Sequence, residues 1–390
     1  MNIEQNGIIT LIKSALSGEK LALPEGFDFA KACETAKAHG VSAIIYYGAL
    51  NCGIDSSSAE MQMLFLATCT YFSVSERQMF MLNSISKAFE ENGISYMPLK
   101  GTVLKALYPK TEMRVMGDAD ILIRMEEYDK VREIMLSLGF DEGGVSDHEI
   151  KWLHESLFVE LHSKLIPSYN KDYYAYFGNG WQLAKENDGN EYRFKMTAED
   201  ELIYLFTHFA KHYRDAGIGI KHILDIWVYL RANSNMNEEY IKEELGKLEL
   251  LNFYLNILDT LEAWFENKPE TPETRLITDV IFKSGAAGTY ESSVVSAALK
   301  SSKGRSTRNA GMRKIFKKIF TPFEVMRKKY KILNKAPVLL PIYWVVNIAE
   351  TLNRKGVSTV VGDLQTIQKK NIDSYQEALN FVGLDFNFEE

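Results

Sequence analysis

The sequence predicts an α+β protein in which a mixed β-sheet with flanking helices lies between two helical parts. Apolar residues recur at helical spacing through residues 59–92, and the period then changes to short, partly alternating apolar segments. Helical spacing returns once these segments end. We therefore divide the chain into an N-terminal helical region (1–92), an α/β core (93–166) and a mainly helical C-terminal region (167–390).

The elements of the first two parts follow from local signals. The helix over 59–92 has N-cap candidates among the serines just before it and a stop signal at Asn92-Gly93. Pro98 favours an edge position or a strand end for the first strand, since proline cannot donate to a ladder. Strands are predicted at 94–99, 119–123, 148–154 and 157–162, and helices at 102–108 and 125–138.

The C-terminal region begins its helical pattern at Thr197, which is a good N-cap followed by acidic residues in the first turn. Residues 268–273 (KPETPE) predict a turn or linker. Helices are predicted at 198–214, 219–232, 238–247 and 249–266.

Composition narrows the class of protein. The chain has 390 residues, of which 46% are hydrophobic and 25% charged, which excludes a disordered, collagen-like or small disulfide-bonded chain. Cys33, Cys52 and Cys69 are few, odd in number and without motif spacing, which indicates a reducing compartment. The start of the chain lacks the pattern of a signal peptide, and the longest apolar run, 337–346, is too short for a membrane span of about 20 residues. We expect a cytoplasmic protein without a transmembrane segment.

Charge is distributed unevenly along the chain. The formal net charge is −7, yet residues 300–335 contain thirteen Lys or Arg and one acid, Glu324, so this segment alone carries about +12. Its basic residues alternate with Phe, Ile and Tyr, which suits a polyanion such as an RNA backbone or an anionic membrane face. The same pattern also suits an amphipathic helix with a solvated face.

The segment 117–123 (GDADILI) is the most informative one for chemistry. Alternate side chains of a strand share a face, so Asp118 and Asp120 point the same way. Two adjacent carboxylates repel each other unless a cation lies between them, and Mg²⁺ commonly binds one or two carboxylates together with substrate phosphates. The alternative is a pair of acids on a solvated edge.

Two neighbouring segments strengthen the metal hypothesis. Lys100-Gly101-Thr102 lies where a strand gives way to a helix, and such a turn directs backbone N–H groups and a positive dipole at phosphate. Glu160 and His162 share one face of the strand 157–162, which lets Glu160 approach the Asp pair across the sheet. The structural alternatives are an ordinary capped turn and a surface glutamate.

A second polar group is expected in the C-terminal region. His208 and His212 lie four residues apart on one helix face, and with Asp225 they form a possible polar cluster or substrate contact. Zinc binding is disfavoured, because the glutamate of the HExxH pattern is missing. Nearby basic residues, Lys211, Arg214 and Lys221, either reach phosphates or lie on the surface.

These motifs occur in a recognisable order. The Gly-Thr turn after a strand, Asp-x-Asp on the next strand and a third acid on a later strand resemble the nucleotidyltransferase superfamily with a DNA-polymerase-β-like fold. The segments MPLKGTVLKALYP, GDADILI with Arg114 before it, and VELH are similar to the bacterial family of uncharacterised nucleotidyltransferases. The sequence departs from the superfamily pattern in having Thr102 in place of a second Gly or Ser, and Glu160 in place of the commoner Asp.

The resemblance implies roles for these residues. Asp118, Asp120 and Glu160 would form the catalytic metal set for two Mg²⁺ ions, and Glu160 would complete this set or accept the acceptor's proton. The nucleotide would bind at Lys100, Gly101, Thr102 and Arg114. His162, His208, His212 and Asp225 are possible substrate contacts. The implied reaction moves an NMP from an NTP to a hydroxyl acceptor and releases pyrophosphate.

Other functions stay open at this point. One alternative is a catalytically silent nucleotide- or polyanion-binding module, such as a toxin–antitoxin component, on the same fold. Another is a phosphotransferase that uses the same metal site. The sequence does not identify the acceptor, which is a small molecule, a glycan precursor, a protein or an RNA.

Overall fold

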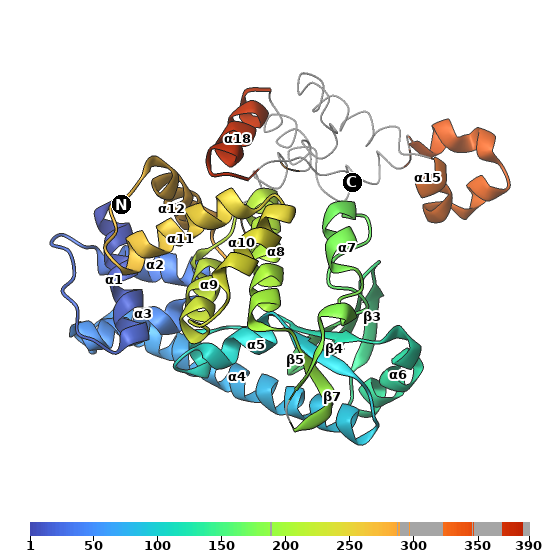
Figure 1. Ribbon diagram of the computed structural model, residues 1–390, viewed down its shortest axis with the longest axis horizontal. Helices are drawn as coiled ribbons and strands as arrows, with labels where there is room; N and C mark the ends of the chain where they lie inside the picture. Colours follow the sequence, from blue (N-terminus) through green and yellow to red (C-terminus); the bar gives the residue numbers. More distant parts are fainter. Residues whose placement is uncertain are drawn as a thin grey trace.

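The computed structural model describes residues 1–187, 189–286, 288, 296, 323–344, 346 and 369–384. Its N-terminal part consists of helices α1 (Ile3–Ser17), α2 (Phe29–His39), α3 (Ser42–Cys52) and α4 (Ala59–Glu91) (Figure 1). The predicted helix over 59–92 is confirmed as α4. The side chain of Ser58 accepts a hydrogen bond from the backbone N–H of Met61 and so begins this helix.

The sheet has seven strands in the order β3-β4-β5-β2-β1-β7-β6. The pairs β2–β5 and β1–β7 are parallel and the others antiparallel, so the sheet is mixed, as predicted. The strands are β1 (Tyr96–Leu99), β2 (Ala119–Ile123), β3 (Asp141–Val145), β4 (Glu149–His154), β5 (Leu157–His162), β6 (Lys185–Asn187) and β7 (Asn190–Lys195). All four predicted strands are therefore present.

Three strands were not predicted. β3 contains Gly143 and Gly144, which have low strand propensity, and it forms an exposed edge. β6 and β7 form a hairpin around Gly189, and β7 pairs with β1, so the sheet continues beyond the predicted core boundary at residue 166. β1 is consequently an inner strand rather than an edge. Pro98 is tolerated there because the pairing with β7 is at Tyr96, two residues earlier.

Short helical elements connect the strands. The predicted helix 102–108 is α5 (Gly101–Leu104) followed by a 3₁₀ turn (Lys105–Leu107), and a second 3₁₀ turn (Thr111–Met113) precedes β2. The predicted helix 125–138 is a 3₁₀ turn (Met125–Glu127) followed by α6 (Tyr128–Ser137).

The C-terminal helices are α7 (Lys171–Phe177), α8 (Ala198–Ala216), α9 (Ile220–Ala232), α10 (Glu238–Lys247), α11 (Leu251–Phe265), α12 (Pro272–Ser284), α15 (Phe323–Lys329) and α18 (Lys369–Phe381), with 3₁₀ turns at Trp181–Leu183, Lys331–Asn334 and Pro337–Leu339. Four of them, α8 to α11, agree closely with the predicted bounds, whereas α7, α12 and α15 were not predicted. Thr197 caps α8 as predicted, and its hydroxyl accepts from the Asp200 N–H at 3.1 Å. α12 begins inside the predicted linker 268–273. Most of the basic segment 300–335 lies outside the described residues, which include it only from residue 323 onward.

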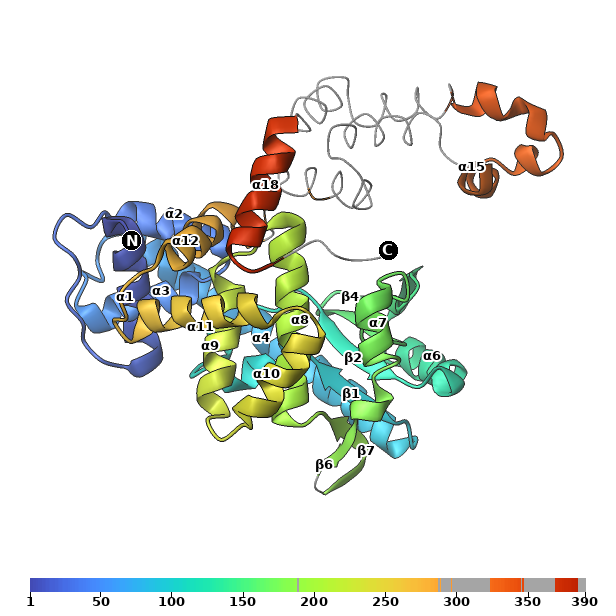
Figure 2. The ribbon, with the colours of Figure 1, turned by 45° about the horizontal axis from the view of Figure 1, so that its top comes forward.

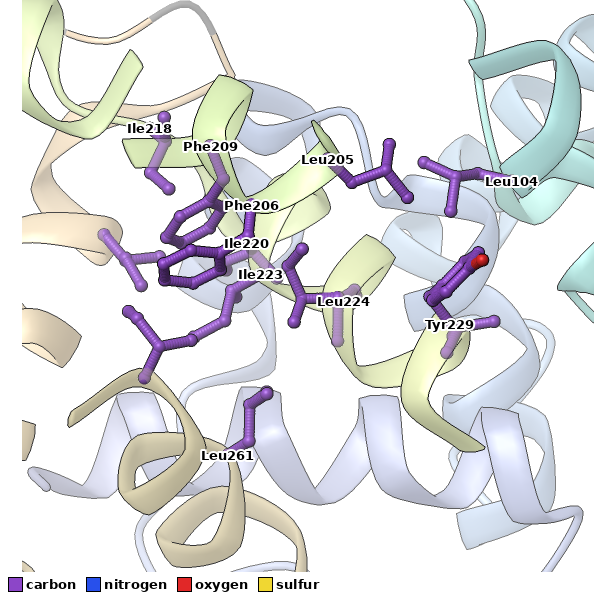
Figure 3. Packing of buried hydrophobic residues seen from close by; sticks show 14 of the residues in the cluster. Leu104, Leu205, Phe206, Phe209, Ile218, Ile220, Ile223, Leu224, Tyr229 and Leu261 are labelled. Atoms are coloured by element: carbon purple, nitrogen blue, oxygen red, sulfur yellow. The ribbon is translucent and has the colours of Figure 1, made fainter. Parts of the chain in front are cut away.

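Two hydrophobic clusters bind these parts together. The larger one joins the N-terminal helices with α8, α9 and α11, and Phe206, Phe209 and Ile223 lie within it (Figure 3). The smaller one lies between the sheet and helices α4 and α6. Ala119 and Ile121 of β2 belong to the smaller cluster and Leu122 to the larger one. Alternation along β2 therefore directs Asp120, like Leu122, to the face covered by the C-terminal helices.

Figure 2 shows the resulting arrangement, with α8 and α9 standing beside the sheet. Helix α7 belongs to the same hydrophobic cluster, and its Phe177 packs against Tyr204 of α8. Among the described residues, no helix combines the length and apolar character needed to cross a lipid bilayer.

Candidate active site

Three carboxylates meet where the parallel strands β2 and β5 lie side by side. Asp120 and Glu160 are register partners on these strands, and Asp118 immediately precedes β2. All three line one cavity of about 470 Å³. The structure therefore brings together the residues that the Asp-x-Asp and VELH motifs pointed to.

Asp120 is the most tightly held of the three. Its Oδ1 accepts hydrogen bonds from Lys100 Nζ and His162 Nε2, each at 2.8 Å, while its side chain is 7% exposed. Burial by itself would raise the pKa of Asp120, but the charges of Lys100 and His162 outweigh it and hold the pKa well below its usual range. Asp120 is consequently ionised and fixed in orientation. His162 is fully buried behind it and is absent from the cavity lining.

Lys100 reaches Asp120 from an unusual backbone conformation. Its φ of +47° with ψ of −115° is a conformation that side-chain-bearing residues rarely adopt, and such strain costs on the order of 1–3 kcal/mol. The turn begins α5 at Gly101, whose backbone lines the cavity. The hydroxyl of Thr102 donates to the Leu99 carbonyl, and Thr102 does not line the cavity. The predicted phosphate contact of Thr102 thus stays a prediction.

Asp118 differs from Asp120 in lacking a close cation. Apart from its own backbone N–H, no group in the described part of the chain hydrogen-bonds its carboxylate. Burial and the neighbouring charge of Asp120 raise the pKa of Asp118. A carboxylate in this position is destabilised when ionised, and a bound cation would remove the penalty.

Glu160 lies at the edge of the same group. Its Oε1 is 3.0 Å from Lys151 Nζ. Burial raises the pKa of Glu160 and Lys151 opposes this, while Glu149, Asp118 and Asp120 add to the rise. Glu160, like Asp118, is thus easier to protonate than Asp120.

Arg114 and Asp225 form a buried clamp at the side of the cavity. Arg114 Nε and Nη2 donate to the two carboxylate oxygens of Asp225, each at 2.9 Å, and the Tyr108 hydroxyl donates to Asp225 Oδ1 at 2.9 Å. Both charged residues line the cavity. Their charges are already mutually satisfied, so the clamp connects the segment before β2 with α9.

The opposite wall comes from α8 and α9. His208 and His212 line it with their Nε2 atoms 3.1 Å apart, and burial holds the pKa of His208 well below its usual range. Lys221, in the first turn of α9, also lines the cavity. Burial, and then the charge of Arg114, lower the pKa of Lys221. No hydrogen bond or ion pair to its ammonium is found among the described residues.

Two groups in the described residues have donor atoms close enough to share one cation. One comprises Asp120, Glu160 and His162, and the other His148, Glu149 and His162, each with donor atoms within 4.8 Å of one another. Only the first group contains two of the predicted carboxylates. His208 and His212 do not belong to either group.

Comparison with known proteins identifies the family. The model of a family described as uncharacterised nucleotidyltransferases matches residues 25–266, which is more than half of the chain and includes every candidate site residue. The chain belongs to this nucleotidyltransferase family. No curated protein matches it.

Among solved structures, the antibiotic-resistance factor ANT(2'')-Ia is 12% identical, and the match covers 50% of this chain and 100% of that chain. The TM-score is 0.34, and a likeness this weak says nothing about this nucleotidyltransferase's substrates.

The candidate site also contains residues that the sequence did not single out. His148, Glu149 and His222 line the cavity, as do Lys211 and Lys221, whose position was left open. Glu149 was within reach of prediction, because β4 and β5 form an antiparallel hairpin that places it opposite His162. His222 carries no such signal, since its position depends on how α9 packs against α8.

Proposed function

We propose that this protein is a Mg²⁺-dependent enzyme that moves an NMP from an NTP to a hydroxyl acceptor and releases pyrophosphate. In this reaction the acceptor oxygen forms a bond to the α-phosphorus, the bond from that phosphorus to the β-phosphate oxygen breaks, and the acceptor hydroxyl loses its proton. A nucleoside triphosphate donor is consistent with action in the cytoplasm.

The observation that carries the proposal is a pair of uncompensated charges in one cavity. Asp118 and Lys221 both line the cavity and each influences the pKa of the other, yet they form no ion pair. A carboxylate needs a cation and an ammonium needs an anion when both are taken out of water. A divalent cation bound to a polyphosphate supplies both charges at once.

The donor set fits Mg²⁺. Within the described residues Asp118 has no hydrogen-bond partner besides its own backbone N–H, Asp120 has an oxygen besides the one held by Lys100 and His162, and Glu160 lies beside Asp120. These are hard oxygen donors of the kind that Mg²⁺ prefers. When bound, the two expected ions would neutralise the phosphate charge and lower the pKa of the acceptor hydroxyl.

The remaining residues have separate tasks in this proposal. Lys221, and with it Lys211, binds the triphosphate from the helical wall, while the backbone of Gly101 approaches it from the sheet side. Lys100 and Arg114, which the sequence suggested as phosphate ligands, act chiefly by fixing Asp120 and Asp225. Glu160 completes the metal set or takes the proton of the acceptor.

One contact favours a second candidate function. The Lys100 ammonium is bonded to Asp120, so a cation already lies against one of the proposed metal ligands. A silent nucleotide- or polyanion-binding module would retain such a contact permanently. A phosphotransferase would use the same residues and release a nucleoside diphosphate instead.

Calorimetry with each of the four NTPs, with and without Mg²⁺, separates these candidates. We expect Mg²⁺-dependent binding of at least one NTP, and loss of this binding in Asp118→Asn but not in the exposed control Asp141→Asn. Incubation with acceptor mixtures (sugars, aminoglycosides, protein and RNA) should then release pyrophosphate. Release of a nucleoside diphosphate would indicate phosphoryl transfer, and binding without any product would indicate the silent module.

A further inference from the structure

A second group of metal-binding side chains lies beside the proposed magnesium site, on the strand pair β4–β5. His148, Glu149 and His162 have donor atoms within 4.8 Å of one another. Glu149 and His162 are register partners on the two antiparallel strands, so their side chains stand next to each other on one face of the sheet. His148 directly precedes β4 and lines the cavity together with Glu149. Residues from two neighbouring strands thus converge at the cavity wall.

The buried imidazole of His162 has one ring nitrogen without a partner. Its Nε2 is hydrogen-bonded to Asp120 Oδ1 at 2.8 Å. Within the described residues no hydrogen bond reaches its Nδ1, although the side chain is only 1% exposed. The hydrogen bond to water that this nitrogen loses on folding is therefore not replaced by one within the described part of the chain. A buried polar atom of this kind is typical of a place where a water molecule or an ion binds.

The order of the strands directs this nitrogen toward His148 and Glu149. β5 lies between β2 and β4 in the sheet. Nε2 of His162 is turned toward Asp120 on β2, and the two nitrogens of an imidazole ring point in widely different directions. Nδ1 of His162 therefore faces the side of β4, where Glu149 lies directly opposite.

We propose that His148, Glu149 and His162 bind a zinc ion, with Nδ1 of His162 as one of its ligands. Two imidazoles and one carboxylate are a ligand set that zinc uses in proteins, with the fourth position left for water or a substrate. Mg²⁺ prefers oxygen donors, so this group differs in chemistry from the three carboxylates beside it. The fourth position would face the cavity, because His148 and Glu149 both line it.

The contacts around the group suit a zinc ion. His148 Nε2 lies 3.2 Å from Glu149 Oε2. Two ligands of a tetrahedral zinc ion, each about 2.0 Å from the metal, are separated by roughly 3.3 Å. A histidine that binds a metal usually donates its other ring N–H to an oxygen atom. Asp120 accepts such a bond from His162, and Ser146 Oγ lies 3.3 Å from Nδ1 of His148 and can accept one there.

The protonation state of His148 also suits metal binding. Burial lowers the pKa of His148 to about 4, although the neighbouring Glu149 opposes this shift. The imidazole is therefore neutral at pH 7, which is the form that binds a metal ion.

The zinc affinity of the untagged full chain, measured by competition with a chromogenic chelator, tests this proposal. We expect one zinc ion per chain in the wild type and in Cys69→Ser, which removes an exposed thiol that could bind zinc elsewhere. His148→Ala and Glu149→Gln should each bind zinc at least tenfold more weakly. Both side chains line the cavity, so the metal-free variants should keep the melting temperature of the wild type. A wild type that binds no zinc, or an affinity that neither substitution changes, would overturn the proposal.

X-ray absorption at the zinc edge identifies the ligands without a substitution in the site. Cys69→Ser with one equivalent of zinc should show nitrogen and oxygen ligands at about 2.0–2.1 Å, two of them imidazoles, and no sulfur. Sulfur ligands or a single imidazole would contradict the proposal.

A further comparison separates this group from the proposed magnesium site. Asp118→Asn should bind zinc as tightly as the wild type, and excess Mg²⁺ should not displace the zinc, because Mg²⁺ binds imidazole weakly. Zinc that is lost in Asp118→Asn or displaced by Mg²⁺ would occupy the carboxylates instead, and the proposal would be wrong. These outcomes do not depend on whether nucleotidyl transfer is observed.

Discussion

Replacing Asp225 by Asn should destabilise the folded protein severely, although the substitution only exchanges one carboxylate oxygen for an NH₂ group. Asp225 accepts two hydrogen bonds from Arg114 and one from Tyr108, all at 2.9 Å, and the side chains of the ion pair are 9% and 8% exposed. The Asn amide would turn its NH₂ group toward donors and leave the guanidinium without a counter-charge. Breaking a buried ion pair in this way costs about 3–5 kcal/mol.

A double-mutant cycle separates the pair from its surroundings. We expect Arg114→Met and Asp225→Leu each to cost about as much as Asp225→Asn, whereas the double variant Arg114→Met/Asp225→Leu removes both charges and should cost far less than these two single changes together. The coupling free energy should exceed about 2 kcal/mol.

Urea unfolding in the presence of a chelator measures these costs, and Lys242→Met is the control because it breaks an exposed helix pair worth about 0.3–0.5 kcal/mol. If the losses in unfolding free energy of the two single variants simply add up in the double variant, or if Asp225→Asn costs less than about 1 kcal/mol, then the Arg114–Asp225 ion pair does not stabilise the fold as argued. Arg114 would then be available for the phosphate contact that the sequence suggested.

Three further predictions follow from other charges. Asp118→Asn should stabilise the metal-free protein at neutral pH, since burial and the charge of Asp120 disfavour the ionised form and raise its pKa, and should remove the Mg²⁺-induced shift in melting temperature. Lys221→Met should weaken pyrophosphate binding in calorimetry at least tenfold without destabilising the free protein, whereas the exposed control Lys195→Met should leave binding unchanged. Burial raises the pKa of Glu201 to about 7, so the folded protein retains a proton that the unfolded chain loses above about 4.5, and stability falls as the pH rises through 7. Glu201→Gln should therefore stabilise the protein by up to about 3 kcal/mol at pH 8 and have little effect at pH 4, and an equal effect at both values in thermal melts would contradict the burial argument.

Local signals were sufficient for most of the fold. The period change near residue 94, the caps at Ser58 and Thr197 and the alternation in 157–162 are properties of contiguous residues, and the corresponding elements are present. β3 and β6 lack such signals because, apart from Val145, their residues are polar or glycine. They become strands because neighbouring strands offer them hydrogen-bond partners, which is a property of the tertiary structure.

In the candidate site, too, features that depend on contiguous residues could be predicted, whereas features that depend on tertiary packing could not. Asp118, Asp120 and Glu160 could be predicted, since strand alternation fixes which side chains share a face. The side chains that Lys100 and Arg114 bind could not be predicted. Asp225, for example, is 111 residues from Arg114 along the chain and contacts it only because of the way α9 packs. Both cations line the cavity, but residue type alone did not indicate which side chains they bind.

The distribution of charge in the cavity determines how a divalent cation changes the affinity for polyphosphate. The sheet wall is acidic through Asp118, Asp120 and Glu160, while Lys211 and Lys221 make the helical wall basic. A bare polyphosphate gains from the helical wall but is repelled by the carboxylates, whose field is strong in a partly buried site. A divalent cation between the walls converts that repulsion into attraction. Pyrophosphate should therefore bind more tightly with Mg²⁺ than without it, and the gain should vanish in Asp118→Asn, whereas Lys221→Met should weaken binding under both conditions. Equal affinities of the wild type for pyrophosphate with and without Mg²⁺ would show that anion binding does not involve the carboxylates. The lysines of the helical wall and the proposed metal ligands would then act independently of each other.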